Sequence, residues 1–419
     1  MRRLLILCFL SLPAFGAKKI TLLHLSDYHS HALPFYTEAG ERGGIARAIG
    51  FLRAQKRAGA LVFSGGDTIN KGSPAWSDKY GCIEWPWLNG IVDAMAFGNH
   101  DADYGMEAFQ RCRASIDYPI LSANTNGFPS YVVRKVNGVR IGVFAIAGAD
   151  FPQLVKTPGF TFSDPMAAAR ETVRTLREVE HVDAVVMIGH QHEEADYELA
   201  RQVPGIDLIF GSHSHLARDL TQIPGTKTWF ISPSQYLTYI SRVVLTIDNG
   251  VIDVSGGLVT VDDRLREDRA IAKKVQKLQR ELESDPQYRD LFVTIGRLEQ
   301  PLSVEALAQK TLSVMKAVTN AEVGLSTHST FRHPLASGAL TLEALRAALP
   351  YDNEIVVCEV SGTQLQSVID DETFVSGPAI DPNRTYRIAT TDYLANLKKL
   401  SCTKTGKRAR EELRATLSP

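Results

Sequence analysis

Five short apolar segments of this chain each end in side chains of the kind that bind metal ions. They are followed by Asp27-Tyr28-His29, Gly66-Asp67, Gly98-Asn99-His100, Gly189-His190 and His213-Ser214-His215. A lone histidine after a strand is more often structural, but five of the chain's 11 histidines fall in these segments. Oxygen and imidazole donors suit Zn, Mn, Fe or a similar divalent cation better than Ca or a thiophilic metal. The pattern therefore predicts a metal site.

The number of candidate ligands indicates how many ions the site holds. Seven ligands are too many for one ion that keeps a position open for substrate, and they suffice for two ions that share a carboxylate. Two ions can clamp the attacking and leaving oxygens of an in-line displacement and supply hydroxide at neutral pH, which phosphate-ester hydrolysis needs most. The candidates are Asp27, His29, Asp67, Asn99, His190, His213 and His215.

The sequence lacks the motifs of other enzymes that act on phosphates, esters or nucleotides. The sequence has no GxxxxGK[ST] loop, no GxSxG elbow and no GxGxxG fingerprint, so kinase-like, α/β-hydrolase and dinucleotide-binding functions are disfavoured. The 46 Lys and Arg residues balance 47 Asp and Glu residues. This balance gives no electrostatic reason to expect nucleic acid or an anionic membrane as the main partner.

The elements that must position these side chains form an α/β fold. Residues 20–25 and 61–63 are expected strands joined by a helix around 45–52, and a strand, helix and strand in this order imply a right-handed parallel crossover. Ligands then lie beyond the carboxyl ends of the strands. Asn137-Gly138 and Asn249-Gly250 are hairpin signals, so the sheet must be mixed. An irregular segment that could overhang the site is expected from Lys71-Gly72-Ser73-Pro74 and the aromatic-rich residues Trp76 to Trp87.

The first residues have the features of a secretory signal. Met1-Arg2-Arg3 precedes an apolar run from Leu4 to Pro13, and small residues permit cleavage near Gly16 or Ala17. The run is too short to span a bilayer, which takes about 20 residues. A buried first strand is the alternative. We expect a periplasmic or extracellular protein without a stable membrane anchor after cleavage.

Four cysteines remain after such cleavage. They are Cys82, Cys112, Cys358 and Cys402, an even number in an oxidising compartment. Four cysteines allow three connectivities. Cys82 with Cys112 is the preferred pair, and free buried thiols are the alternative.

At 419 residues the chain is expected to form two domains. We divide it into a signal peptide (1–17), a catalytic domain (18–263), a helical linker (264–294) and a smaller C-terminal domain (295–419). The linker carries Ile271, Val275, Leu278 and Leu282 at helical spacing. The residues from Lys398 to Arg414 read as a basic tail.

At the ligand motifs the chain resembles the calcineurin-like metallophosphoesterases, and within them the secreted bacterial 5′-nucleotidase family. All five motifs of that group occur in order, as Asp27-Tyr28-His29, Gly66-Asp67, Gly98-Asn99-His100 with Asp103, Gly189-His190 and His213-Ser214-His215. The resemblance implies a four-layer α/β/β/α sandwich for the N-terminal two thirds and a smaller C-terminal α/β domain of the 5′-nucleotidase type.

The resemblance also implies roles for individual residues. One ion would be held by Asp27, His29, Asp67 and His215, and the other by Asp67, Asn99, His190 and His213. Asp67 would bridge them. His100 would face the phosphoryl group and be oriented by Asp103. Asp101 stands where the family commonly has Glu, and we expect it to be a solvated or helix-start carboxylate.

The C-terminal domain departs from the family at two places. Where the family has an Asn-Gly-Gly-x-Arg loop, this chain has His328-Ser329-Thr330-Phe331-Arg332, which keeps only the arginine. The family's Gly-Gly-Asp-Gly-Tyr segment and the aromatic beyond it are replaced by Leu397-Lys398-Lys399. Substrate contacts are expected from Arg332, Phe331 and Tyr351. The catalytic residues are therefore complete while the nucleotide-binding motifs are not.

Three hypotheses follow. The first is a secreted hydrolase that cleaves nucleoside monophosphates or related esters with metal-activated water. The second keeps the dinuclear site for cyclic nucleotides, nucleotide sugars, other phosphate esters or, as in a sulfur-oxidising branch, a protein-bound sulfonate. The third, a non-catalytic binding protein, is disfavoured because every ligand position and His100 are intact.

Overall fold

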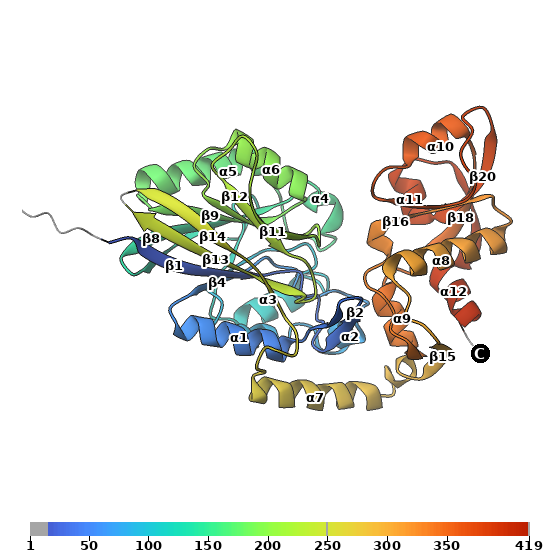
Figure 1. The fold of residues 1–419 in the computed structure, drawn as a ribbon, viewed down its shortest axis with the longest axis horizontal. Coiled ribbons are helices and arrows are strands. Elements are labelled where there is room, and N and C mark those ends of the chain that lie inside the picture. Colours follow the sequence, from blue (N-terminus) through green and yellow to red (C-terminus); the bar gives the residue numbers. More distant parts are fainter. Residues whose placement is uncertain (1–15, 249, 418–419) are drawn as a thin grey trace, which may run out of the picture.

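The computed structural model describes residues 16–248 and 250–417. The predicted signal residues 1–15 and Asn249 of one hairpin signal lie outside this part of the chain. Within the described ranges, no helix has the length and apolar character needed to cross a membrane. The chain forms a larger N-terminal body and a smaller C-terminal body, with one helix running beneath the first toward the second (Figure 1).

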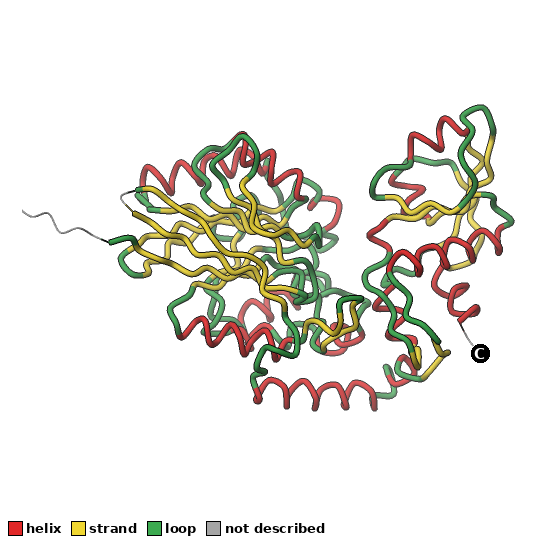
Figure 2. Tube along the Cα trace, viewed as in Figure 1, coloured by secondary structure: helices red, strands yellow, loops and turns green. Residues whose placement is uncertain are grey.

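The larger body is built on two six-stranded sheets that lie face to face. The first sheet consists, in order, of β14 (Val251–Thr260), β13 (Tyr239–Asp248), β1 (Lys18–Leu25), β4 (Leu61–Ser64), β5 (Ala94–Ala96) and β6 (Ile120–Leu121). The second consists of β11 (Ala217–Gln222), β12 (Trp229–Pro233), β10 (Leu208–Gly211), β9 (Ala184–His190), β8 (Val139–Ala147) and β7 (Tyr131–Val136). Figure 2 shows these two strand layers between outer layers of helix.

Strand alternation decides which core each side chain joins. Successive residues of a strand point to opposite faces, so Leu22 enters the core between the sheets and Leu23 the outer core. The outer core of the first sheet is covered by α1 (Ile45–Arg57) and α3 (Met106–Ala114), and that of the second by α5 (Pro165–Arg174) and α6 (Glu193–Gln202). The predicted α/β/β/α sandwich is confirmed.

The strand directions are mixed. The strands β1, β4, β5 and β6 pair in parallel, as do β8, β9, β10 and β12. The antiparallel pairs of these two sheets are the hairpins β7–β8 and β13–β14, together with β1–β13 and β11–β12. Asn137 and Gly138 both have positive φ angles, of 52° and 75°, as a two-residue hairpin turn requires. The prediction of a mixed sheet is confirmed.

The aromatic residues from Trp76 to Trp87 do not overhang the site, whereas Lys71 of the preceding loop donates its N–H to Asp103 beside it. The aromatic-rich segment forms α2 (Ala75–Tyr80) and a 3-10 turn, Trp85–Leu88, and its tryptophans Trp76 and Trp85 are buried in the outer core of the first sheet. The expectation was wrong for the aromatic residues because burial of large aromatic rings outweighed a weak local pattern. The Cys82–Cys112 disulfide ties this segment to α3. That pairing was predicted and is confirmed.

The helix α7 (Arg269–Ser284) connects the two bodies and is packed against the first. Its Ile271, Val275 and Leu282 are buried in the same core as Leu52 of α1. Asp268 caps its first turn and pairs with Arg53.

The C-terminal body has a five-stranded sheet, ordered β19 (Thr373–Ser376), β16 (Val323–Thr327), β20 (Thr385–Thr391), β18 (Glu354–Ser361) and β21 (Cys402–Arg408). Around it lie α8 (Val304–Thr319), α9 (Leu342–Ala348), α10 (Gly362–Val368), α11 (Asp392–Leu397) and α12 (Ala409–Leu417). The expected basic tail is in fact β21 and α12, because Leu413 and Leu417 are buried and Cys402 is bonded to Cys358.

The remaining short elements include two strand pairs and a single helical turn. The strands β2 (Pro34–Thr37) and β3 (Gly40–Gly43) form a small hairpin, and β15 (Thr294–Leu298) pairs with β17 (Gly338–Thr341). The single turn α4 (Phe151–Leu154) follows β8.

Candidate active site

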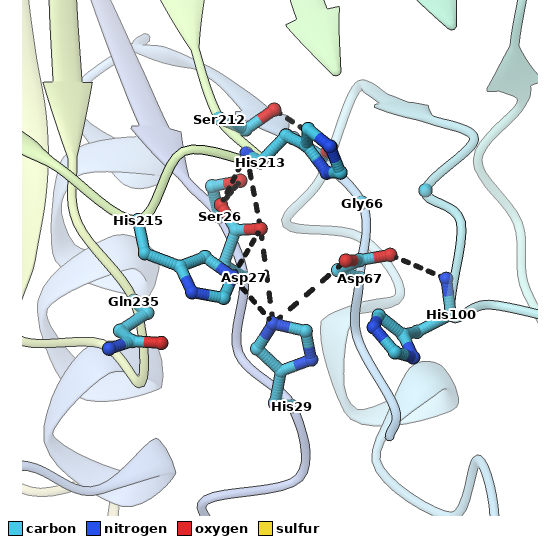
Figure 3. A network of polar contacts seen from close by, with 12 residues as sticks. Ser26, Asp27, His29, Gly66, Asp67, His100, Ser212, His213, His215 and Gln235 are labelled. Carbon is cyan, nitrogen blue, oxygen red and sulfur yellow. Dashed lines mark hydrogen bonds and ion pairs between the residues drawn. The ribbon is translucent and has the colours of Figure 1, made fainter. Parts of the chain in front are cut away.

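The carboxyl ends of the central strands of both sheets meet at one edge of the larger body, where the predicted ligands converge (Figure 3). Among the predicted ligands, two groups have atoms close enough to share one ion each: Asp27, His29 and His215, and Asp67, His190 and His213. Asn99 lies beside the second group, with Oδ1 3.2 Å from Nε2 of His190. All seven predicted ligands therefore come together, from loops that follow β1, β4, β5, β9 and β10.

The first group surrounds a buried carboxylate. Nε2 of His29 and Nε2 of His215 lie 3.1 Å apart, and Oδ1 of Asp27 lies 3.9 Å and 3.5 Å from them. The backbone N–H of His213 also donates to the Asp27 carboxylate at 3.2 Å. Asp27 is thus held in place by the segment that carries two further ligands.

Asp67 lies between the two groups. Its Oδ2 is 3.3 Å from Nε2 of His190 and 3.9 Å from Nε2 of His29, and its Oδ1 accepts the backbone N–H of His100 at 2.8 Å. Figure 3 shows its carboxylate between His29 and His100. It is the one carboxylate of the described ligand set that faces both groups, as a bridging ligand must.

The donor set fits divalent cations. Nδ1 of His190 is 2.5 Å from the carbonyl oxygen of Gly65, and Nδ1 of His29 is 3.4 Å from that of Ile69, so each ring donates on that side and its Nε2 presents a lone pair. These lone pairs face carboxylate and amide oxygens that also lack a proton. A cation satisfies such a cluster, whereas hydrogen bonding within it cannot.

The backbone at the ligands is unusual. Five of the seven candidates have left-handed φ angles, and these are Asp27, His29, Asp67, His213 and His215. Non-glycine residues rarely adopt this region, and such strain is concentrated at functional sites. A sharp turn directly after each strand brings these side chains back over the strand ends.

Two glycines let the central loops approach each other. A Cβ at Gly98 would lie 2.2 Å from the backbone nitrogen of Asp67, and one at Gly66 would lie 2.7 Å from the nitrogen of Gly98. Both sites exclude any larger residue. The Gly-Asp and Gly-Asn motifs therefore specify the distance between Asp67 and Asn99 as well as the donors themselves.

His100 stands beside the cluster with its ring fixed by a neighbour. Nδ1 of His100 donates to Oδ2 of Asp103 at 2.8 Å, and Lys71 N–H donates to the same oxygen at 3.1 Å. Nε2 of His100 is therefore left to face the site. About a fifth of each side chain is exposed, 21% for His100 and 23% for Asp103. Both remain reachable from solvent.

Electrostatics distinguish His100 from His215. Burial by itself lowers the pKa of His100, but the charge of Asp67 and the bond to Asp103 outweigh it and raise the pKa to about 10. Burial, together with the positive charge of Arg332, lowers the pKa of His215 to about 4. Cations bound at Asp67 would take up part of its charge, while the Asp103 bond is independent of them.

Asp101 corrects an expectation. It was expected to be solvated or at a helix start, but it is 1% exposed. Its carboxylate accepts backbone N–H groups of Gly98 at 2.8 Å, Thr68 at 2.8 Å and Asp67 at 3.2 Å. Burial and the nearby Asp67 raise the pKa of Asp101 to about 7. This carboxyl joins the two central loops, a role that short-range sequence patterns cannot reveal.

We expect Asp101→Ala to destabilise the protein by on the order of 3 kcal/mol, because it leaves buried N–H groups without an acceptor. Thermal or urea unfolding measures this. Asp117→Ala is the matched control, since the exposed Asp117 accepts N–H of Gly90 at 3.0 Å and 3.2 Å in contact with water. Equal losses for the two variants would contradict the role of Asp101.

The C-terminal body contributes side chains to the site. Nη1 of Arg332 is 2.5 Å from Nδ1 of His215, and its Nη2 donates to the hydroxyl of Tyr351 at 3.1 Å. Tyr351 is 39% exposed. Phe331 is different: it is 5% exposed and packs in the core of this body against Phe374. The expectation that Phe331 contacts substrate is corrected, because its ring is already covered.

Helix α9 holds the C-terminal body against the loop that leads to α2. Oε1 of Glu343 accepts the N–H of Ala75 at 2.6 Å, and Arg346 donates to the carbonyl of Gly72. The same loop donates from Lys71 to Asp103. The contact between the two bodies is thus connected to the residue that orients His100.

Two polar residues near the site were not found by sequence reasoning. Asp150 and His192 follow β8 and β9 and lie next to His213. His192 stands two residues after His190, and that spacing was the signal available in the sequence. Nothing in the sequence marked Asp150.

Comparisons with known proteins find a matching family model for each of the two bodies. Residues 20–217 match the family model described as calcineurin-like phosphoesterase, and residues 297–378 match the 5'-nucleotidase C-terminal domain. Among curated proteins, the chain is 23% identical to the trifunctional nucleotide phosphoesterase YfkN of Bacillus subtilis over 85% of its length, but spans 28% of that longer protein. It is 24% identical to protein UshA of Yersinia enterocolitica, over 90% of this chain and 85% of that one.

Solved structures show the same architecture. The 5'-nucleotidase precursor from Thermus thermophilus superposes with a TM-score of 0.76 at 20% identity, covering 96% of each chain. The sulfate thiohydrolase SoxB of the same organism also gives 0.76 at 21% identity, covering 97% of this chain and 95% of that one. At these identities the likeness establishes the fold.

Proposed function

Because the chain belongs to the calcineurin-like phosphoesterases that carry a 5'-nucleotidase C-terminal domain, we propose that it hydrolyses nucleoside monophosphates and related phosphate monoesters. The observation that carries this proposal is the convergence of two ligand groups around Asp67, with His100 beside them. The site would hold two divalent cations of the Zn or Mn type. Phosphate release from nucleotides and aryl phosphates tests the activity.

Each ligand has a role in this proposal. Asp27, His29, Asp67 and His215 hold one cation, and Asp67, Asn99, His190 and His213 hold the other. Bound cations supply two things, a water of lowered pKa and neutralisation of charge on phosphoryl oxygens. The protein supplies rigid positions, since the ligands follow strands and their rings are fixed by bonds such as that from His190 to Gly65.

His100 acts on the phosphoryl group. With Nδ1 bound to Asp103, its Nε2 can donate a hydrogen bond to a phosphoryl or leaving oxygen. Asp103 keeps this tautomer and supports the positive charge of the ring. The charge that develops on oxygen during transfer is thus met by a positioned proton donor.

Arg332 and Tyr351 are proposed to hold the substrate. Arg332 is the positive charge that reaches the ligand groups from the C-terminal body, and it contacts Tyr351 through a hydrogen bond. A guanidinium suits the planar recognition of phosphate oxygens. Tyr351 lies near enough to His100 to act on it electrostatically. A substrate between the bodies would therefore meet groups from both.

Base recognition is expected to be weak. One base–aromatic stack contributes about 1–3 kcal/mol, so losing the family's aromatic segment costs up to roughly a hundredfold in base-dependent affinity. We expect AMP and UMP to be hydrolysed with similar kcat/KM, and p-nitrophenyl phosphate to compete well with AMP. Steady-state kinetics on the three compounds measures this. An AMP preference over the aryl ester beyond about a thousandfold would show a nucleotide pocket and contradict the expectation.

The division of the chain follows from the same proposal. Residues 18–263 carry the metal site, 264–294 connect, and 295–419 bring Arg332 and Tyr351 to the substrate. Residues 1–17 act as an export signal, so that the mature protein works in the periplasm or outside the cell. N-terminal sequencing of the exported protein tests the cleavage near Gly16 or Ala17.

A further inference from the structure

Asp150 and His192 form a cluster with His213, which they share with the proposed dinuclear site. Oδ2 of Asp150 lies 3.3 Å from Nε2 of His192 and 3.1 Å from Nε2 of His213. Ligand atoms of a tetrahedral zinc shell are separated by about 3.3 Å, given metal–ligand distances near 2.0–2.1 Å. Two of the three ligand pairs have the spacing of such a shell, and all three ligand atoms lie within 4.8 Å of one another.

The fold holds these residues rigidly. They follow the adjacent parallel strands β8, β9 and β10, which pair Ala147 with His190 and Gly189 with Gly211. Ser214, next to His213, accepts the N–H of Glu193, next to His192, at 2.9 Å. Ligands on loops braced in this way need little reorganisation on binding.

One carboxylate oxygen of Asp150 has no hydrogen-bond partner among the described residues. Asp150 stands at the N-cap of α4, yet its side chain makes no capping bond. The unpartnered oxygen is Oδ1, and it is buried. Such an atom is costly unless a ligand or water meets it. A cation would satisfy Oδ1 if the carboxylate bound it through Oδ1 as well as through the Oδ2 that faces the two histidines.

The surroundings favour a positive ion that exchanges with solvent. The His192 side chain is 61% exposed, and that of Asp150 is 32% exposed. Glu194 and Glu372 act on His192 electrostatically. Glu372 belongs to the C-terminal body, just before β19. Negative charge from both bodies therefore lies near the cluster. The fourth position of the shell is open, and a water molecule could fill it.

The geometry points to a third, exchangeable site for a zinc-like divalent cation, formed by Asp150, His192 and Nε2 of His213. His213 has two ring nitrogens, so Nε2 can serve this site while the other nitrogen serves the inner site; the cation then takes the place of the Nε2 proton, which leaves to solvent. This site goes beyond the proposed activity. This third site should bind its cation more weakly than the two inner sites do. Its three ligands are partly exposed, and one of them, His213, also serves an inner site.

Counting bound zinc tests the third site. The purified protein is dialysed against rising free Zn²⁺ and the bound metal is measured by mass spectrometry. At saturation, wild type should bind one ion more than His192→Ala, whatever number the inner ligands hold. The count left in His192→Ala tests the dinuclear proposal separately. His181→Ala removes another exposed histidine and should bind as many ions as wild type.

Two results would overturn the site. One is an equal saturation count in wild type and His192→Ala, or an equal loss in His181→Ala, which would indicate unspecific binding by surface histidines. The other is a pair of results: Asp150→Asn binds one ion fewer than wild type, while His192→Ala binds as many as wild type. Asp150 would then only orient His213 through a hydrogen bond. Loss of the same weakly bound ion in both Asp150→Asn and His192→Ala supports the third site.

Discussion

Asp67→Ala is expected to remove both tightly bound ions and nearly all activity. Asp67 is 1% exposed and its carboxylate faces both ligand groups, with Oδ2 3.3 Å from His190 and 3.9 Å from His29. Neither group keeps a full shell without it. The remaining imidazoles would also lose the negative charge that offsets two cations. Metal analysis after gel filtration into metal-free buffer measures the loss, together with phosphate release.

A carboxylate at the other end of a site strand is the matched control. Asp207 precedes β10, whereas the ligands follow it, and its Oδ2 accepts the N–H of Val185 at 2.7 Å and pairs with Arg177. Asp207→Asn should keep the metal and the activity. An active Asp67→Ala, or wild-type protein that holds one tight ion, would contradict the bridged pair.

His100→Ala is expected to lower kcat by ~10²–10⁴, the usual contribution of a positioned proton donor or acceptor, with the metal content unchanged. The ring contacts Asp103 through Nδ1, and the backbone N–H of His100, which alanine keeps, is what donates to Asp67. The substitution therefore removes the imidazole without disturbing the proposed bridge. Steady-state kinetics and metal analysis on the same preparation measure both.

The neighbour that orients His100 gives a graded comparison. Asp103→Asn keeps an acceptor near Nδ1 but removes its charge, so kcat should fall less than in His100→Ala. His181→Ala again serves as an exposed-histidine control. Loss of metal in His100→Ala would place His100 among the ligands and contradict its proposed role.

Much of the site can be predicted from the sequence because strand ends are local features. An apolar run that stops at Asp27, Asp67 or His190 already places that side chain at the carboxyl end of a strand. Parallel strands bring such ends to one edge, so ligand types alone predict a shared site. Asn137-Gly138 fixed one antiparallel pair for the same local reason.

The contacts between segments could not be predicted in this way. Asp101 and Asp103 are close in sequence and chemically alike, yet one is buried against three N–H groups and the other faces His100. Whether Phe331 meets substrate or core depends on Phe374, which belongs to another element. These outcomes are decided by which surfaces pack together, and no short pattern records that.

The sequence by itself therefore determined the donor types, their places at strand ends and an α/β fold with a mixed sheet, because strand termination and turn signals are properties of neighbouring residues. The four-layer arrangement followed from the resemblance to the family. Only the tertiary structure decided that Asp150 and His192 join His213, since it depends on β8, β9 and β10 lying side by side. It also decided that Arg332 reaches the ligands from a separate body. Both are consequences of long-range packing, in which burial of apolar surface sets the partners of polar groups.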